Sequence, residues 1–270
     1  MILVDIKINK LNFTMYVPLE KNTRNHSIIK NHFFELKESL NIINALNYYK
    51  KIKNIKINKN IYFLDIGGNI GWYPSLLGRF GYSILSFEPF EKNYYYSRKN
   101  YCHLNQESNV IIINQGLYNI KKDCYYYKDN SGIANGMILC DDNNKNKTFR
   151  NRFKKAGIVS LTRLSSFIRF LSNKNVALIK MDVEGSEGKV IESGIDLITK
   201  FHVPFIFIEF TPKFLLKHKT NPKKFIELFI NNGYKISLNG FLNKDYISYD
   251  ELMKRVNFQI NCYLIYEALK

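Results

Sequence analysis

The 270-residue sequence has no apolar run near the ~20 residues that a membrane-spanning helix needs. Cysteine is scarce, and the four present, Cys102, Cys124, Cys140 and Cys262, show neither a CxxC motif nor metal-ligand spacing. The first residues lack the basic region, long apolar core and cleavage site of a signal peptide. These absences predict a cytoplasmic protein in a reducing environment, without a membrane span.

Negative charge is also in short supply, with 23 Asp and Glu against 40 Lys and Arg, a formal net charge of +17. Such a surface attracts anions, including nucleic acids, nucleotide-sugars, acidic glycans and anionic lipids. The sequence is also rich in Lys, Asn and Ile, which an AT-rich genome over-encodes, so composition bias is a second explanation of the charge. A hydrophobic content of 46% is enough for a packed core and excludes a disordered chain.

From residue 61 onward, short apolar strands alternate with helices, a pattern typical of a doubly wound α/β sheet. The predicted strands cover residues 62–66, 83–88, 110–115, 176–182, 205–210, 234–238 and 258–266. The predicted helices cover residues 73–80, 92–104, 161–171, 186–200 and 222–232. We therefore expect the main domain over residues 61–270.

Residues 1–60 are predicted to form an N-terminal extension of this domain. Apolar residues alternate over residues 2–17, which predicts a β-hairpin, and recur every three or four positions over residues 33–46, which predicts a helix. Residues 129–155 are polar and rich in Asn and Lys, and are predicted to form a mobile loop. Loops over sheet ends often carry function.

The sharpest motif is the run Asp65-Ile-Gly67-Gly68-Asn69-Ile-Gly71, in which an apolar strand ends in an acid and a glycine-rich turn opens a helix. Glycines allow a sharp turn and a close approach of the backbone to a ligand. The spacing is not the Gly-x-Gly-x-x-Gly of dinucleotide-binding proteins. Asp65 would repel a pyrophosphate, whereas it suits a cofactor with a cationic end, such as an amino-acid ammonium.

A second acid, Glu88, follows the next strand about 20 residues on, where doubly wound folds hold ribose hydroxyls. The pair of strand-end acids is more specific than either alone and predicts a cofactor site. Pro89, next to Glu88, and Gln115, at the end of the third strand, are assigned to the same site.

The fourth strand stops at Asp182, before a Gly-Ser turn that opens a helix. Because neighbouring parallel strands end at one edge of the sheet, Asp182 and Asp65 are expected there together. Asp182 is our main catalytic candidate, and an alternative role is to hold the turn through backbone N–H groups. Glu209 is a second candidate that could instead pair with a lysine or cap a helix. His218, after the fifth strand, is a third.

These segments together resemble the FkbM family of S-adenosylmethionine-dependent methyltransferases. The resemblance runs from about residue 61 to residue 210 and rests on DIGGNIG at 65–71, FEP at 87–89, KMDVEGSE at 180–187 and IEF at 208–210. It implies a class I Rossmann-like sheet of order 3-2-1-4-5-7-6 with strand 7 antiparallel, S-adenosylmethionine as cofactor, and O-methylation, commonly of a sugar or polyketide hydroxyl. Gly68 departs from the family pattern, since many relatives carry Ala there, and we expect the change to be harmless.

The implied mechanism is in-line displacement at the sulfonium methyl, with a base or a metal assisting the acceptor hydroxyl. Asp182 and Glu209 are candidates for either task, so a divalent metal such as Mg²⁺ is possible but not implied. We expect a small-molecule or glycan acceptor. An RNA methyltransferase (2′-O or cap) that uses the basic surface is the alternative, and a non-catalytic binding protein that retains the fold is a second. The glycine spacing disfavours a nicotinamide oxidoreductase.

Overall fold

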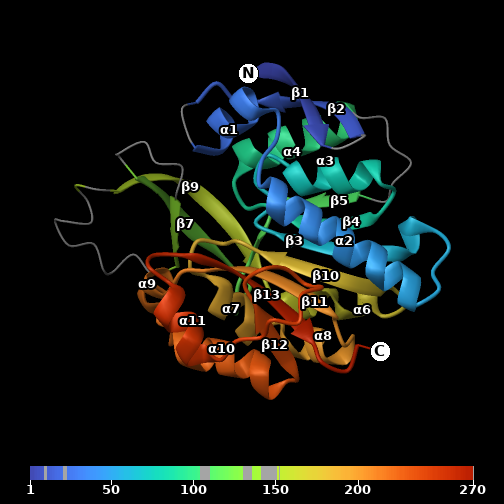
Figure 1. Ribbon diagram of the computed structural model, residues 1–270. Helices are drawn as coiled ribbons and strands as arrows, with labels where there is room; N and C mark the ends of the chain where they lie inside the picture. Colours follow the sequence, from blue (N-terminus) through green and yellow to red (C-terminus); the bar gives the residue numbers. More distant parts are fainter. Residues whose placement is uncertain are drawn as a thin grey trace.

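The computed structural model describes residues 1–8, 11–20, 23–103, 110–129, 136–140, 151 and 153–269. Helices pack on both faces of a seven-stranded central sheet (Figure 1). Its strands are β3 (Ile61–Ile66), β4 (Ser83–Phe87), β5 (Val110–Ile113), β10 (Asn175–Met181), β11 (Phe205–Phe210), β12 (Tyr234–Ser237) and β13 (Ile260–Tyr266). All residues of β3 and β4 are buried, which explains their uninterrupted apolar sequence.

The order of the central sheet is β12-β13-β11-β10-β3-β4-β5. Numbered along the chain and read from the β5 edge, this is the predicted order 3-2-1-4-5-7-6. The neighbours from β5 to β11 pair in parallel, and β13 pairs antiparallel with both β11 and β12. The predicted doubly wound α/β fold is therefore confirmed, and the carboxyl ends of β3, β4, β10 and β11 lie at one edge.

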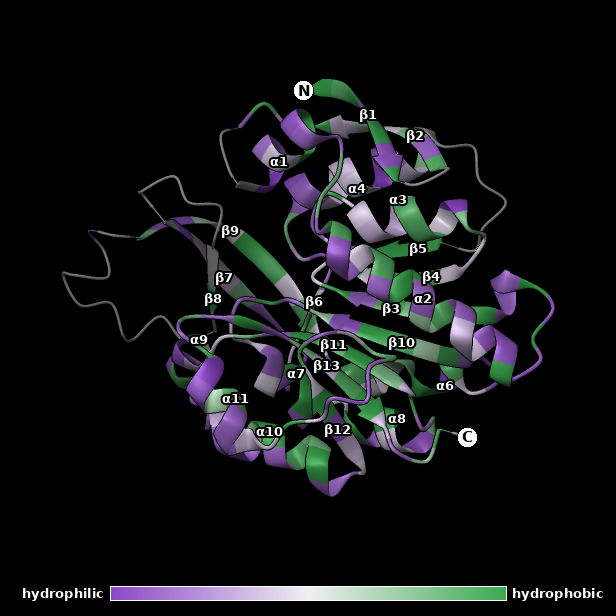
Figure 2. Cartoon of the chain, viewed as in Figure 1, coloured by the Kyte–Doolittle hydropathy of each residue, from purple (hydrophilic) through white to green (hydrophobic). Residues whose placement is uncertain are grey.

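Two cores, one on each face, hold the sheet and its helices together. On the first face pack α1 (Thr23–Asn31), α2 (Leu36–Ile52), α3 (Trp72–Arg79) and α4 (Glu91–His103). On the second pack α6 (Ile168–Leu171), α7 (Glu187–Glu192), α8 (Ile195–Lys200), α9 (Pro212–Lys217), α10 (Pro222–Asn231) and α11 (Tyr249–Arg255). Successive residues of a strand enter opposite cores, as Phe63 and Leu64 do. Figure 2 shows the apolar strands enclosed between helices with polar outer faces.

The N-terminal extension contains the predicted hairpin, formed by β1 (Ile2–Ile8) and β2 (Leu11–Val17), followed by α1, α2 and the short 3-10 helix η1 (Asn58–Asn60). The buried Asn100 of α4 ties the hairpin down. Its Oδ1 accepts from Tyr16 N at 2.6 Å, and its Nδ2 donates to Tyr16 O at 3.1 Å and to Ile70 O at 2.9 Å. The division of the chain at residue 60 stays a prediction.

A second sheet corrects the expectation of a loop over residues 129–155. Its strands, in the order β6-β9-β7-β8, are β6 (Gly116–Leu117), β7 (Lys122–Asp129), β8 (Gly136–Leu139) and β9 (Phe153–Thr162). Cys124, Val159 and Leu161 form its small core, while Lys154 and Lys155 of β9 are exposed and belong to the lysines that made the segment look polar. Residues 130–135, 141–150 and 152 of the predicted loop lie outside the described residues.

Two predicted helices are also shorter or broken. Instead of a helix over residues 161–171, β9 continues to Thr162 and is followed by the 3-10 helix η3 (Leu164–Phe167) and α6. The helix expected over residues 186–200 breaks into α7 and α8 at Ser193 and Gly194. A Cβ on Gly194 would lie 2.6 Å from the Leu164 side chain, so the break lets η3 pack closely.

A disulfide joins Cys124 of β7 to Cys140, just after β8. Such a bond is typical of oxidising compartments, so it is at odds with the reducing environment expected from the cysteine pattern. The cytoplasmic location stays a prediction. Within the described chain, no helix is both long and apolar enough to cross a membrane.

Candidate functional site

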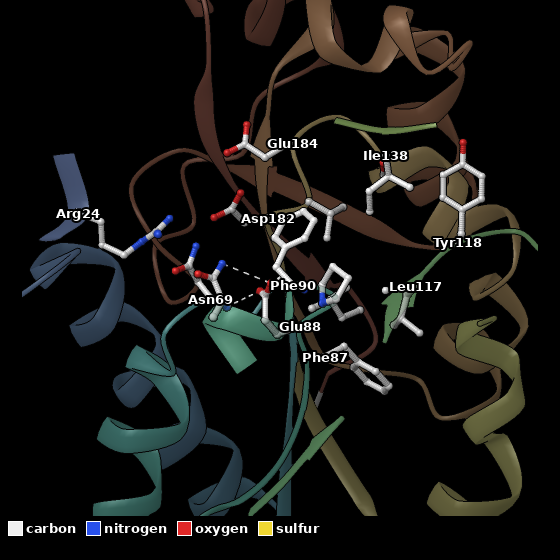
Figure 3. Close-up of a pocket in the computed structure, with 17 residues that line it drawn as sticks. Arg24, Asn69, Phe87, Glu88, Phe90, Leu117, Tyr118, Ile138, Asp182 and Glu184 are labelled. Atoms are coloured by element: carbon white, nitrogen blue, oxygen red, sulfur yellow. Dashed lines mark hydrogen bonds between the residues drawn. The ribbon is translucent and has the colours of Figure 1, made fainter. Parts of the chain in front are cut away.

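A pocket of about 760 Å³, open to solvent, lies at the carboxyl ends of β3, β4 and β10 (Figure 3). Polar side chains lie on the left of this view: Arg24, Asn69, Asp182 and Glu184. Less polar side chains lie on the right: Leu117, Tyr118 and Ile138. The site thus has one charged end and one end suited to a flat apolar group.

The glycine-rich turn forms the floor of the pocket at Gly67, whose φ is +87°. The N–H groups of Gly67 and Gly68 donate to Phe87 O, each at 3.0 Å. A Cβ on Gly67 would lie 1.9 Å from the backbone oxygen of Asp182. We expected glycine here for the approach of a ligand, but the structure requires it first so that the turn can pass the end of β10.

Gly68 and Gly71 do not line this large pocket. Gly71 caps α3 with a φ of +85° and packs against Ser97, whose Cα would lie 2.8 Å from an added Cβ. A Cβ on Gly68 would lie 2.1 Å from Ser86 Oγ. The Ser86 hydroxyl therefore occupies the space of the alanine methyl group that the family pattern has at residue 68.

Glu88 lines the pocket although it is only 3% exposed. Its carboxylate accepts hydrogen bonds from Asn69 N at 2.8 Å and Phe90 N at 3.0 Å, and from Asn93 Nδ2 at 3.4 Å. Burial raises the pKa of Glu88 to about 7, against the effect of these donors. Because a carboxylate offers about four acceptor positions, Glu88 can still accept from a ligand hydroxyl.

Of the two other residues assigned with Glu88, Pro89 lines the pocket and Gln115 does not. The neighbouring Asn114 supports this wall instead. Its Nδ2 donates to Glu88 O at 2.9 Å and to Pro89 O at 3.2 Å. The segment after the third strand thus contributes to the site through Asn114 behind the wall, and β6 contributes Gly116 in it.

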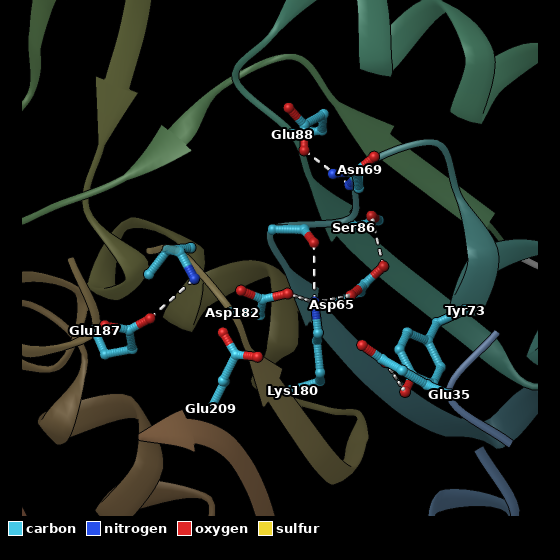
Figure 4. Close-up of polar contacts among 12 residues, drawn as sticks. Glu35, Asp65, Asn69, Tyr73, Ser86, Glu88, Lys180, Asp182, Glu187 and Glu209 are labelled. Carbon is cyan, nitrogen blue, oxygen red and sulfur yellow. Dashed lines mark hydrogen bonds and ion pairs between the residues drawn. The ribbon is translucent and has the colours of Figure 1, made fainter. Parts of the chain in front are cut away.

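Lys180 lies at the centre of the buried charges (Figure 4). Its Nζ donates to Gly67 O at 3.0 Å, and lies 3.5 Å from Asp182 Oδ2 and 3.9 Å from Asp65 Oδ1. Burial lowers the pKa of Lys180, but Asp182 and Asp65 outweigh it and the net shift is upward. The ammonium therefore stays charged and joins the glycine turn to both strand-end acids.

Asp65 is fully buried and does not line the pocket. Its Oδ2 accepts from Ser86 Oγ at 3.1 Å, and burial raises its pKa while Lys180 opposes the rise. The direct contact with a cationic ligand that we expected of Asp65 is therefore available to Asp182 instead.

Asp182 lines the pocket with a side chain that is 21% exposed. Its alternative role, holding the turn after β10, belongs to Glu187, whose Oε1 accepts from Val183 N at 3.0 Å. Burial raises the pKa of Glu187 to about 7. Glu184, with a φ of +55°, also lines the pocket, and burial followed by the nearby Asp182 raises its pKa to about 7.

Glu209 and His218 lie near the pocket but not in its lining. Glu209 points toward Asp182 in Figure 4 and accepts from Gln259 Nε2 at 2.8 Å. Burial and then the charge of Asp182 raise the pKa of Glu209 to about 8. His218 Nδ1 lies 3.5 Å from Ser186 Oγ, and burial with Lys217 lowers the pKa of this histidine to about 4. Ser186, which lines the pocket, therefore lies next to His218, which does not.

A smaller pocket of about 280 Å³ of empty space adjoins the first, and Asp182, Arg24, Gly67 and Asn69 line both. It also contains Glu35, whose Oε2 accepts from Tyr73 OH at 2.8 Å. Burial raises the pKa of both groups. Arg24 and Glu35 come from the N-terminal extension, and sequence reasoning missed them because no local motif surrounds either.

Within the described residues, no group of three His, Cys, Asp or Glu side chains could hold a metal ion. The metal option at Asp182 and Glu209 is therefore not supported.

Comparison with known proteins gives one family match. The family model of the methyltransferase FkbM domain matches residues 65–236. No curated protein sequence gives a significant match.

Several solved structures have a similar fold. The methyltransferase FkbM of Methylobacillus flagellatus KT is 13% identical with a TM-score of 0.45, over 90% of this chain and 53% of that one. A putative rRNA methylase of Clostridium thermocellum is 10% identical with a TM-score of 0.45, over 86% and 99% of the two chains. The magnesium protoporphyrin IX methyltransferase of Synechocystis PCC 6803, solved with bound SAM, is 9% identical with a TM-score of 0.43, over 93% and 86%. The chain spans about half the length of the Methylobacillus structure.

Proposed function

The chain belongs to the FkbM methyltransferase family, and from that premise we propose that it is an S-adenosylmethionine-dependent O-methyltransferase. Its acceptor is a hydroxyl group of a sugar, a glycan or another small molecule. The observation that carries this proposal is the position of Asp182, whose carboxylate lines both pockets and is held by the buried Lys180.

The larger pocket fits the cofactor in the chemistry of its lining. Glu88 has acceptor capacity left for ribose hydroxyls, and Leu117 and Ile138 offer an apolar surface to the adenine ring. Asp182 and Glu184 bring negative charge to the end where the sulfonium and ammonium would lie. When bound, S-adenosylmethionine supplies an activated methyl group on its sulfonium sulfur.

The smaller pocket offers a place for the acceptor beside Asp182. It combines the Glu35 carboxylate and Tyr73 with the rings of Phe34 and Trp72, a mixture of hydrogen-bonding and apolar surface that suits a sugar. Asp182 takes the proton of the acceptor hydroxyl as the acceptor oxygen forms its bond to the methyl carbon. The carbon–sulfur bond breaks in the same step, and its electron pair stays on sulfur.

Lys180 positions Asp182 for this step, since its Nζ lies 3.5 Å from Oδ2 and is itself fixed by Gly67 O. Holding the hydroxyl about 3 Å from the methyl carbon supplies much of the remaining rate enhancement. The protein then needs no covalent intermediate.

The substitution Asp182→Asn tests the proposal, because it keeps the shape of the side chain and removes the proton acceptor. We expect turnover to fall at least ~100-fold and the Tm to change little. The affinity for S-adenosylhomocysteine should fall much less than turnover, because Glu184 keeps a negative charge at the cationic end of the pocket. Glu187→Gln is the matched control. This substitution weakens the hydrogen bond that holds the turn after β10, so it should lower the Tm. The turnover of the protein that remains folded should change little.

The assay follows transfer of a labelled methyl group from S-adenosylmethionine to a panel of methyl glycosides, with short RNA transcripts in parallel across a salt series. The proposal is supported if the wild-type protein labels the glycosides and the Asp182→Asn variant does not. Label in RNA alone would favour the nucleic-acid alternative. A wild-type protein that binds no S-adenosylhomocysteine would favour the non-catalytic one.

A further inference from the structure

More acidic than basic side chains line the larger pocket. Glu88, Asp182 and Glu184 are acidic, and among the lining residues that the structure describes, Arg24 is the one cation. The smaller pocket adds Lys180, which is buried and already bound to Gly67 O and the strand-end acids. Arg24 is therefore the cation that both pockets can offer to a ligand.

Arg24 reaches the site from α1 of the N-terminal extension. Figure 3 shows its side chain extending from that helix toward Asn69 and Asp182. Its guanidinium carbon lies 5.5 Å from the centre of the Phe34 ring, a contact that limits the freedom of the side chain. In the described part of the chain, no carboxylate lies close enough to Arg24 to form an ion pair, so its five N–H donors are not used by one.

The positive charge of Arg24 acts on acids from three different elements. It lowers the pKa values of Glu35, Glu88 and Glu184, in each case against a larger upward effect of burial. These three residues come from the extension, from the end of β4 and from the turn after β10. Arg24 thus lies between the walls of the site, facing the space that a ligand would fill.

We propose that Arg24 binds the α-carboxylate of S-adenosylmethionine, which makes the N-terminal extension part of the cofactor site. This inference rests on the proposed function. The cofactor brings two cations, the sulfonium and the ammonium, and one carboxylate. Asp182 and Glu184 suit the cations and repel the carboxylate, whereas the planar guanidinium of Arg24 matches the carboxylate with two parallel hydrogen bonds.

The test compares ligands that do and do not carry the carboxylate, measured by calorimetry on the full chain. S-adenosylhomocysteine has it, its decarboxylated analogue lacks that group alone, and 5′-methylthioadenosine lacks the whole amino-acid end. We expect Arg24→Gln to weaken S-adenosylhomocysteine binding by about 10- to 100-fold, the loss typical of a charged hydrogen-bonded pair. Binding of the other two ligands should change less than about twofold, since neither carries the carboxylate that Arg24 binds.

Two further variants keep the result interpretable. Arg24→Lys retains the charge without the two-pronged geometry and should give an intermediate loss. Arg98→Gln is the matched control, because Arg98 is an exposed arginine that also lies over an aromatic ring, 5.9 Å from the centre of Tyr94, but outside the pockets. It should leave all three affinities unchanged.

Several outcomes would overturn the inference. Equal weakening of all three ligands would mean that Arg24 only supports the fold of α1. Unchanged binding of S-adenosylhomocysteine, with a loss confined to the KM of an acidic acceptor, would assign Arg24 to the acceptor. If the wild-type chain bound none of the ligands, the proposed function would fail with the inference. Normal wild-type binding with an unaffected Arg24→Gln variant would reject the inference alone.

Discussion

The substitution Lys180→Met removes a buried positive charge and leaves Asp65 buried without its ion-pair partner. Asp65 has no exposed surface, and its Oδ1 has no hydrogen bond, so the lysine 3.9 Å away is the main compensation for its charge. Breaking a buried pair on one side costs about 3–5 kcal/mol. For a chain of this size, that loss lowers the Tm by about 6–20 °C.

The loss should also depend on pH in a defined direction. Burial already raises the pKa of Asp65 above its usual 3.8, and without Lys180 that pKa rises further. A carboxyl group whose folded pKa exceeds its unfolded pKa opposes folding once it is ionised. The variant should therefore be closest to the wild type below about pH 4, where the carboxyl is protonated in both states, and lose stability as the pH rises through the folded pKa.

Urea unfolding at several pH values measures both effects, and the double variant Lys180→Met/Asp65→Asn is the control. Removing both charges leaves no unpaired ion, so the double variant should recover at least half of the stability lost by Lys180→Met. A Lys180→Met protein within about 1 kcal/mol of the wild type at pH 7 would refute this account of the buried pair.

Two further substitutions probe the glycine turn and the second acid. Gly68→Ala should destabilise the wild-type chain by about 1–3 kcal/mol, because the added methyl group clashes with Ser86 Oγ. The same substitution should cost clearly less in a Ser86→Ala background. Thermal unfolding of the wild type, the two single variants and the double variant measures both losses. An equal loss in both backgrounds would exclude that clash as the cause. Because the pKa of Glu88 is raised to about 7, binding of S-adenosylhomocysteine should strengthen between pH 6 and 8 as this carboxyl ionises. Calorimetry should find that dependence reduced in Glu88→Gln, with the remainder due to Glu184, whose pKa burial also raises to about 7. A variant that kept the full dependence would exclude Glu88 as its source.

The strands of the central sheet could be predicted because buried parallel strands have a distinctive sequence pattern. Each is a short apolar run, and Asp65, Glu88 and Asp182 mark the ends of three of them. The resemblance to a known family then supplied the order, including the antiparallel last strand.

The role of Lys180 has a signal in the sequence. Side chains two apart on a strand share a face, so Lys180 and Asp182 lie on the same side of β10, and the sheet register pairs Lys180 with Asp65. A lysine inside an otherwise apolar strand, two residues before an acid, therefore indicates a buried ion pair at the sheet edge.

Other features had no local signal of this kind. Arg24 lies 41 residues before Asp65 in a polar stretch, and only the packing of α1 brings it to the site. In the second sheet, β9 has Val159 and Leu161 in a small core, whereas its Lys154 and Lys155 are exposed, and these lysines concealed the strand. Neither feature follows from composition or periodicity.

During synthesis of the chain, the N-terminal hairpin cannot dock on α4 before Asn100, which forms the hydrogen bonds to it, has been made. Tyr16 and Asn100 are 84 residues apart, and a ribosome adding about 5–20 residues per second needs about 4–17 s to cover that distance. Throughout that interval the hairpin can pack only on the earlier helices α1 and α2, and its contacts with α4 are still missing. The hairpin can form early because the contacts between its two strands are local. The surface of α4 on which it packs comes from a later part of the chain. Newly made chains therefore pass through a stage in which the part of the hairpin's apolar face that α4 covers is exposed to solvent.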